Sequence, residues 1–305
     1  MHPLPAPRRI RLAPDAAPNA DLDSTTEAPV TLAVHEGGIG PAVVFSHGFP
    51  ELAYSWRHQY QPLVDAGYRV VIPDQRGYGG SDAPEAIEDY DIDHLCGDLA
   101  RLLDALEIER AVFVGHDWGG FVAWAMPILH PDRTAGVIGV NTPYMARTAI
   151  PPTQMMRMLA GGDDTKIYIL WFQEPGVAEA VLDAHPDLIF DRLMRTPLSP
   201  EEVARMMAEE GADMNPFRRL HEMEPRGEPL LDEAELAHYV ETFARTGFRG
   251  GINWYRNFDR NWERHPEIGV EKVSHPALMV TAEWDVVLSP PWRPTCRCVA
   301  RIWNP

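Results

Sequence analysis

Cysteine is scarce in this sequence, and its scarcity argues against two kinds of architecture. The three cysteines, Cys96, Cys296 and Cys298, are too few for a disulfide framework and cannot form a four-cysteine zinc site. The pair Cys296 and Cys298 could bind a metal, but two ligands in a terminal segment are weak evidence for a metal centre. We therefore expect no metal or other cofactor, and a reducing cytoplasm as the surroundings of the protein.

Positive charge and long apolar runs are also lacking. The chain carries 27 Lys and Arg against 45 Asp and Glu, a net charge of −18, which disfavours nucleic acid and anionic membranes as partners. No stretch stays apolar over the length that a membrane span needs, and no apolar run follows Arg8-Arg9, so we expect neither a span nor a signal peptide.

What the sequence does contain is a regular alternation of strand and helix patterns. Short apolar stretches predict strands, and stretches with helical periodicity predict helices between them. The predicted strands are 30–35, 42–46, 68–72, 110–114, 136–140 and 276–282, and the predicted helices are 54–66 and 92–106. Strands that alternate with helices indicate an α/β fold with a mostly parallel sheet.

The pattern changes after residue 141 to helical, Met-rich sequence interrupted by Pro and Gly. We interpret residues 29–141 and 266–289 as the α/β core and residues 142–265 as a helical insertion, or lid, on the carboxyl edge of the sheet. Residues 1–28 are expected to be loosely ordered apart from a short edge strand at 9–12, and residues 290–305 form an atypical tail.

The stretch from Gly115 to Gly120, Gly-His-Asp-Trp-Gly-Gly, lies between a predicted strand and a predicted helix. Strand, sharp turn and helix are the context of a nucleophile elbow, and here Asp117 occupies the position of the nucleophile. The N–H groups at the start of the following helix point towards it. A carboxylate in this place can attack a saturated electrophilic carbon. The alternative is that Asp117 only caps the helix.

With these residues in view, the chain resembles the soluble-type epoxide hydrolases of the α/β-hydrolase superfamily over residues 31–289. The elbow is shared with haloalkane dehalogenases, and the segments around the two tyrosines are more specific. The segments that carry the resemblance are His47-Gly48-Phe49-Pro50, the elbow, Tyr168 ahead of Phe172-Gln173-Glu174-Pro175-Gly176, Tyr239 ahead of Gly247-Phe248-Arg249-Gly250, and Asn253-Trp254-Tyr255-Arg256.

The resemblance implies an α/β-hydrolase fold and a two-step hydrolysis of a small apolar epoxide by water. It implies that Asp117 attacks the epoxide and that lid residues Tyr168 and Tyr239 donate a proton to the ring oxygen. Taken alone, either tyrosine could be plain lid core.

The second step, in which water attacks the ester, has its own implied residues. The backbone N–H groups of Phe49 and Trp118 would form the oxyanion hole, and Asp285 would orient a histidine base. The alternative for Asp285 is a turn residue at the end of a strand.

The sequence departs from the family pattern at the histidine base. The family places it beyond the orienting acid, whereas no histidine follows His275 here, so we assign no catalytic histidine. We interpret the tail as the product of a truncation or frameshift that removes the last strand and helix, against the alternative of an authentic divergent tail. Two other functions stay open: a haloalkane dehalogenase, and a non-catalytic α/β scaffold that binds apolar molecules.

Overall fold

The structure is a computed structural model, and it describes residues 4–14, 29–196, 198–199, 201–205 and 215–282. The described residues fall into two compact units. The first holds residues 4–14, 29–146 and 267–281, and the second holds the described residues of 147–266 together with residue 282. The division lies at 146/147 and 266/267, whereas the sequence analysis put the lid boundaries at 141/142 and 265/266.

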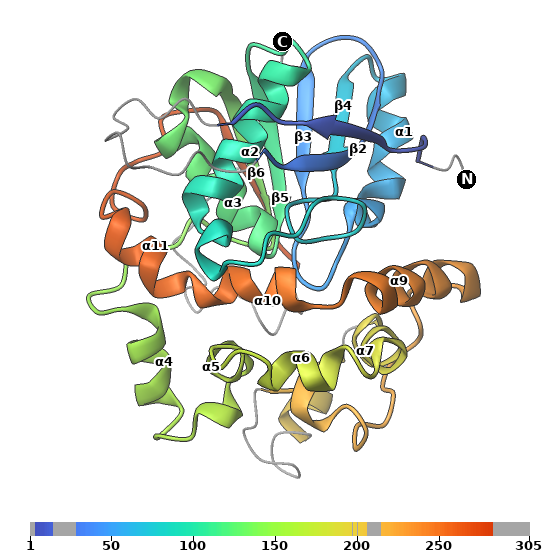
Figure 1. Ribbon diagram of the computed structural model, residues 1–305, viewed down its shortest axis with the longest axis vertical. Helices are drawn as coiled ribbons and strands as arrows, with labels where there is room; N and C mark the ends of the chain where they lie inside the picture. The colour runs from blue at the N-terminus through green and yellow to red at the C-terminus, as the bar shows by residue number, and fades with distance from the viewer. Residues whose placement is uncertain (1–3, 15–28, 197, 200, 206–214, 283–305) are drawn as a thin grey trace. The chain divides into compact units, whose positions relative to one another are not determined.

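The first unit is built on one sheet whose strand order is β1-β2-β4-β3-β5-β6-β7 (Figure 1). The pairs from β4 through β7 are parallel, and β1 and β2 add an antiparallel edge. The mostly parallel sheet predicted from the sequence is therefore confirmed. The strands are β1 Arg8–Arg11, β2 Thr31–Gly37, β3 Ala42–Ser46, β4 Arg69–Pro73, β5 Ala111–His116, β6 Thr134–Val140 and β7 Ala277–Val280.

Helices pack against this sheet and against one another. Helix α1 packs on β4, α3 packs on β3, β5 and β6, and α2 packs on α3. The helix predicted at 92–106 has a buried apolar face, formed by Leu95, Leu99, Leu102, Leu103 and Leu106. The elements are η1 Ala53–Trp56, α1 Arg57–Asp65, η2 Ile87–Tyr90, α2 Ile92–Ala105, α3 Trp118–Leu129 and η3 Pro131–Arg133.

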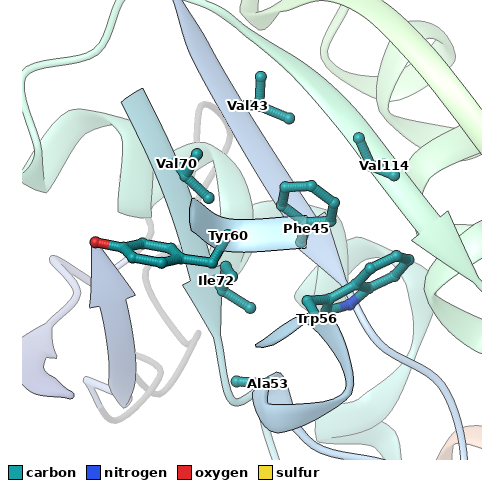
Figure 2. Packing of buried hydrophobic residues seen from close by; sticks show 8 residues of the cluster. All are labelled: Val43, Phe45, Ala53, Trp56, Tyr60, Val70, Ile72 and Val114. Carbon is teal, nitrogen blue, oxygen red and sulfur yellow. The ribbon is translucent and has the colours of Figure 1, made fainter. Parts of the chain in front are cut away.

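The core beneath α1 explains why the central strands of the sheet are continuous apolar runs in the sequence. Val43 and Phe45 of β3 face η1 and α1, where they pack with Trp56, Val70 and other buried side chains (Figure 2). Because side chains alternate along a strand, the buried Val44 points to the opposite face. Both faces of the central strands are therefore covered, as expected for apolar runs without polar alternation.

The edges of the sheet carry two further findings. The edge strand predicted at residues 9–12 is present as β1, which pairs with β2. At the other end, β7 pairs with β6 and leaves Val280 46% exposed. We predicted that the last strand and helix are missing and that residues 290–305 form an atypical tail. Both predictions concern positions beyond residue 282, outside the described part of the chain.

Among the described residues of the second unit the regular elements are helices, and one isolated bridge joins Arg195 and Pro229. This agrees with the absence of a strand pattern in residues 142–265. Helices α7 and α9 pack on each other, as do α4 and α11. The labelled elements are α4 Pro152–Leu159, η4 Asp164–Lys166, α5 Tyr168–Trp171, α6 Val177–Leu182, α7 Pro186–Leu193, η5 Phe217–Arg219, α9 Glu233–Thr246, α10 Arg249–Arg256 and α11 Phe258–Arg264.

Candidate active site

Asp117 lies alone between β5, which ends at His116, and α3, which begins at Trp118. Its backbone has φ 53° and ψ −124°, a conformation that costs a non-glycine residue on the order of 1–3 kcal/mol. Two hydrogen bonds to the Asp117 carbonyl hold the turn: the Thr142 Oγ1 hydroxyl donates at 2.9 Å, and the Gly120 N–H donates at 3.0 Å. The sharp turn predicted at the elbow is therefore present.

The turn is so tight that side chains are excluded around it. A Cβ on Gly115 would lie 1.9 Å from the Gly119 carbonyl oxygen, and a Cβ on Gly119 would lie 2.0 Å from the Ser46 carbonyl oxygen. The start of α3 thus presses directly onto the end of β5 and onto the end of β3. Glycine is required here for close approach of backbone to backbone.

The carboxyl group of Asp117 accepts hydrogen bonds from backbone N–H groups beside the turn. Asp117 occupies the N-cap position of α3, yet its side chain makes no capping hydrogen bond. Its Oδ1 instead accepts a 2.9 Å hydrogen bond from the Phe49 N–H. The Trp118 N–H also bonds to this carboxyl group. The two backbone donors expected from the sequence thus meet the same carboxyl group, an arrangement able to stabilise negative charge on it.

Burial raises the pKa of Asp117 above its ordinary value of 3.8, and the nearby Glu51 charge acts in the same direction. The Phe49 and Trp118 N–H groups and the His116 side chain oppose this rise. Asp117 keeps part of its surface exposed to solvent. A carboxylate that is poorly solvated but reachable is a better nucleophile than one in bulk water.

His47 lies beside the elbow, but both of its ring nitrogens are committed. The Gln75 N–H donates to Nε2 at 3.0 Å, so Nδ1 carries the proton and donates to the Gly48 carbonyl oxygen at 3.0 Å. Burial lowers the pKa of His47, which keeps the ring neutral. Its role is structural, in agreement with its exclusion as the hydrolytic base.

The loop after β4 is a part of the site for which the sequence pattern indicated no role. Arg76 in this loop is 1% exposed and forms two 2.8 Å hydrogen bonds to the Asp98 carboxylate of α2. Asp98 also accepts from Arg101 at 2.8 Å. The buried charges fix the loop, which then places Gln75 against His47. The position of the loop could have indicated its role, because the loop follows β4, the strand that pairs with β3.

In the second unit, Tyr168 and Tyr239 each pack in an aromatic cluster. Tyr168 is partly exposed, and its ring contacts those of Phe172, Phe217 and Tyr255 at centroid distances of 5.4–5.7 Å. Tyr239 is 2% exposed and packs on Phe190 at 5.0 Å. Both tyrosines therefore contribute to the packing of the unit, whatever chemical role they have.

The helix that carries Tyr168 is anchored by two polar side chains. Arg256 donates to the Phe172 carbonyl oxygen at 2.8 Å and forms an ion pair with Glu179 at 2.7 Å. Gln173 donates to the Tyr255 carbonyl oxygen at 3.1 Å. These bonds join the end of α5 to α10 and α6, so the backbone next to Tyr168 has little freedom.

Asp285, the expected orienting acid, lies outside the described residues. Among the residues that the structure describes, no group of three or more His, Cys, Asp or Glu side chains could hold a metal ion. In the same part of the chain, no helix has both the length and the apolar character to cross a membrane.

Comparison with known proteins defines the class and then the family. The model of the α/β hydrolase fold family matches residues 41–171. Epoxide hydrolase A of Mycobacterium tuberculosis is 49% identical over 266 residues, which are 85% of this chain and 81% of that relative. The crystal structure of epoxide hydrolase A from Mycobacterium thermoresistibile has 44% identity and a TM-score of 0.74, covering 90% of this chain and 81% of that one.

A third relative, bifunctional epoxide hydrolase 2 of Rattus norvegicus, is 38% identical over 87% of this chain. The match covers 47% of that relative, so the chain spans about half of its length. Identity and coverage at this level establish membership: the chain belongs to the epoxide hydrolases of the α/β-hydrolase superfamily.

Proposed function

We propose that this chain opens small apolar epoxides and hydrolyses them to vicinal diols through a covalent hydroxyalkyl ester on Asp117. The observation that carries the proposal is the Asp117 carboxyl group, held on the tight turn after β5 with Oδ1 bonded to the Phe49 N–H. The relatives named epoxide hydrolases support the class of substrate.

In the first step, one carboxylate oxygen of Asp117 attacks an epoxide carbon. A carbon–oxygen bond to Asp117 forms, the ring carbon–oxygen bond breaks, and the ring oxygen leaves as an alkoxide. Tyr168 and Tyr239 are the proposed donors that polarise this oxygen and protonate it. The product is a monoester of the diol.

In the second step, water attacks the ester carbonyl carbon of Asp117. Negative charge develops on Oδ1, where the Phe49 N–H stabilises it, and the Trp118 N–H bonds to the same carboxyl group. Collapse of this intermediate expels the diol and restores the carboxylate. The attacking water must lose a proton to a base, which Asp285 would orient.

In the 305-residue sequence no histidine follows His275, and His275 itself bonds to the carbonyl oxygen of Pro131 in η3. A missing base slows only the second step, by about a hundred- to ten-thousand-fold. We therefore propose that the 305-residue polypeptide forms the ester faster than it hydrolyses it. The ester then accumulates on Asp117.

The test is intact-protein mass spectrometry after incubation with styrene oxide. We expect one styrene oxide per chain, located by digestion on the peptide that holds Asp117, and faster loss of the adduct when imidazole is added as an external base. Asp117→Ala should form no adduct, while Asp132→Ala, a surface control in η3, should react like the unsubstituted chain.

Three outcomes would contradict the proposal. An adduct of equal yield in Asp117→Ala would show that another residue is the nucleophile. Halide release from haloalkanes without reaction of epoxides would assign the same nucleophile to dehalogenation instead. Continuous diol formation without an accumulating ester would show that another residue acts as the base.

A further inference from the structure

The residue that immobilises the loop over Asp117 is Gln75. It follows β4, and β4 lies parallel to β3, so the chain leaving β4 runs beside the chain leaving β3. Gln75 is 4% exposed, and its neighbours His47 and Ser46 are 0% and 1% exposed. These three polar side chains therefore lie in the protein interior, where a hydrogen bond is electrostatically stronger than at the surface.

Gln75 forms hydrogen bonds with both ends of its side-chain amide and with its backbone. Its Nε2 donates to the His47 carbonyl oxygen at 2.5 Å, and its Oε1 accepts from the Ser46 hydroxyl at 2.5 Å. Its backbone N–H donates to the His47 ring. The ring in turn donates to the Gly48 carbonyl oxygen. One glutamine thus fixes Ser46 at the end of β3 and His47 in the loop, and the His47 ring extends the restraint to Gly48.

The loop so fixed has no spare space on its other side. A Cβ on Gly48 would lie 2.3 Å from Cβ and 2.4 Å from Oδ1 of Asp117. The next residue, Phe49, donates its N–H to the same Oδ1 at 2.9 Å. A displacement of the loop by about 1 Å would lengthen this bond beyond hydrogen-bond range.

We propose that Gln75 is a positioning residue for the second step, because it holds the Phe49 N–H where negative charge develops on the Asp117 ester. The inference rests on the proposed function. Ring opening makes less demand on this donor, since the carboxylate loses charge in that step. Ester hydrolysis makes a greater demand on this donor, because the oxyanion forms on Oδ1, which the Phe49 N–H already contacts.

The experiment separates the two steps on the 305-residue chain. Styrene oxide first forms the Asp117 ester, and hydroxylamine then cleaves it: nitrogen attacks the ester carbonyl carbon, the carbon–oxygen bond breaks, and the diol leaves. Both rates are followed by intact mass. In Gln75→Met we expect ester formation within about threefold of the unsubstituted chain and cleavage about 10- to 100-fold slower, since loss of one oxyanion donor costs about 10²–10³.

Three comparisons exclude a merely structural effect. In guanidinium chloride the chain is unfolded and the loop is no longer held, so hydroxylamine should cleave the esters of all variants at the same rate. Gln61→Met, which removes a surface bond to Asp65 on α1, should change neither rate. Gln75→Glu should match the unsubstituted chain at low pH, where a neutral carboxyl can still donate to the His47 carbonyl oxygen, and fall behind it as pH rises. This variant also serves if Gln75→Met does not fold.

The outcomes are distinct. If no ester forms in the unsubstituted chain, the proposed function fails and this inference fails with it. If the ester forms, and folded Gln75→Met or ionised Gln75→Glu is cleaved by hydroxylamine at the rate of the unsubstituted chain, the proposed function stands and the inference alone is overturned.

Discussion

Gly48→Ala is a small change with a large expected effect on Asp117. A methyl group at this position would stand 2.4 Å from Oδ1, whereas ordinary contact begins at 3.4 Å. The backbone at Gly48 does not require glycine, because its φ lies outside the left-handed region. The cost therefore comes from space alone, and either the loop or the carboxyl group must move by about 1 Å.

A shift of that size acts on both steps of the reaction. Misplacement of a reacting group by about 1 Å can lower a rate about 100-fold. Loss of the charge-assisted bond from the Phe49 N–H costs about 1.5–3 kcal/mol, or roughly a further 10- to 150-fold on ester hydrolysis. Ester formation in Gly48→Ala should therefore be about 100-fold slower, and cleavage of any ester slower by more.

The assay is the rate of adduct formation with styrene oxide, and thermal unfolding monitors the fold. Gly67→Ala is the matched control in the same unit, since a Cβ there meets nothing within 4 Å although φ is +85°. It should lose about 1 kcal/mol of stability through its backbone and react normally. A stable Gly48→Ala chain that forms the ester at the unsubstituted rate would refute the assignment of this contact to the site.

Further predictions concern charge, the lid tyrosines and an ion pair. Burial raises the pKa of Asp117, so its ionisation opposes folding: the stability it contributes is fully present below pH 3.8 and is lost as pH rises through the raised pKa. Asp117→Asn should therefore raise Tm at pH 7 and not at pH 3, and ester formation in the unsubstituted chain should decline on acidification at a pH above 3.8; a gain independent of pH would contradict this. Tyr168→Phe and Tyr239→Phe should each slow ester formation, and the double variant should nearly abolish it, about a hundred- to ten-thousand-fold in all; unchanged rates would make both residues lid core. Arg256→Met should cost about 3–5 kcal/mol in urea unfolding because it leaves the carboxylate of Glu179, whose side chain is only 12% exposed, without its cation, whereas Arg157→Met, at an exposed pair with Asp164, should cost less than about 1 kcal/mol; equal costs would refute the ranking.

Much of the first unit could be predicted from the sequence, because its signals are local. The strand at 42–46 was predicted with the bounds that the structure gives it, since five apolar or small residues end at a His-Gly turn. The elbow was predicted because strand, glycines and helix lie within a few residues of Asp117. The approach of the Phe49 N–H was predicted too, and it follows from the parallel pairing of β3 and β5.

What could not be predicted depends on contacts between distant segments. Gln75 meets His47 across 28 residues, and Arg76 meets Asp98 across 22. Each pair is set by which strands become neighbours and by their register, which local periodicity does not reveal. The predicted helix at 54–66 was also incomplete, since it divides into η1 and α1 at Trp56 without a side-chain cap.

The geometry at Asp117 also indicates which of its two oxygens does which task. Oδ1 accepts the Phe49 N–H bond, and that bond lowers the electron density available for attack. In the proposed reaction, the oxygen that attacks the substrate carbon is therefore the one that does not accept the Phe49 N–H bond. Oδ1 then becomes the ester carbonyl oxygen without any movement of the loop. Because the oxyanion of the second step forms on that carbonyl oxygen, the donor that restrains Oδ1 in the first step already stands at the place where it is needed in the second.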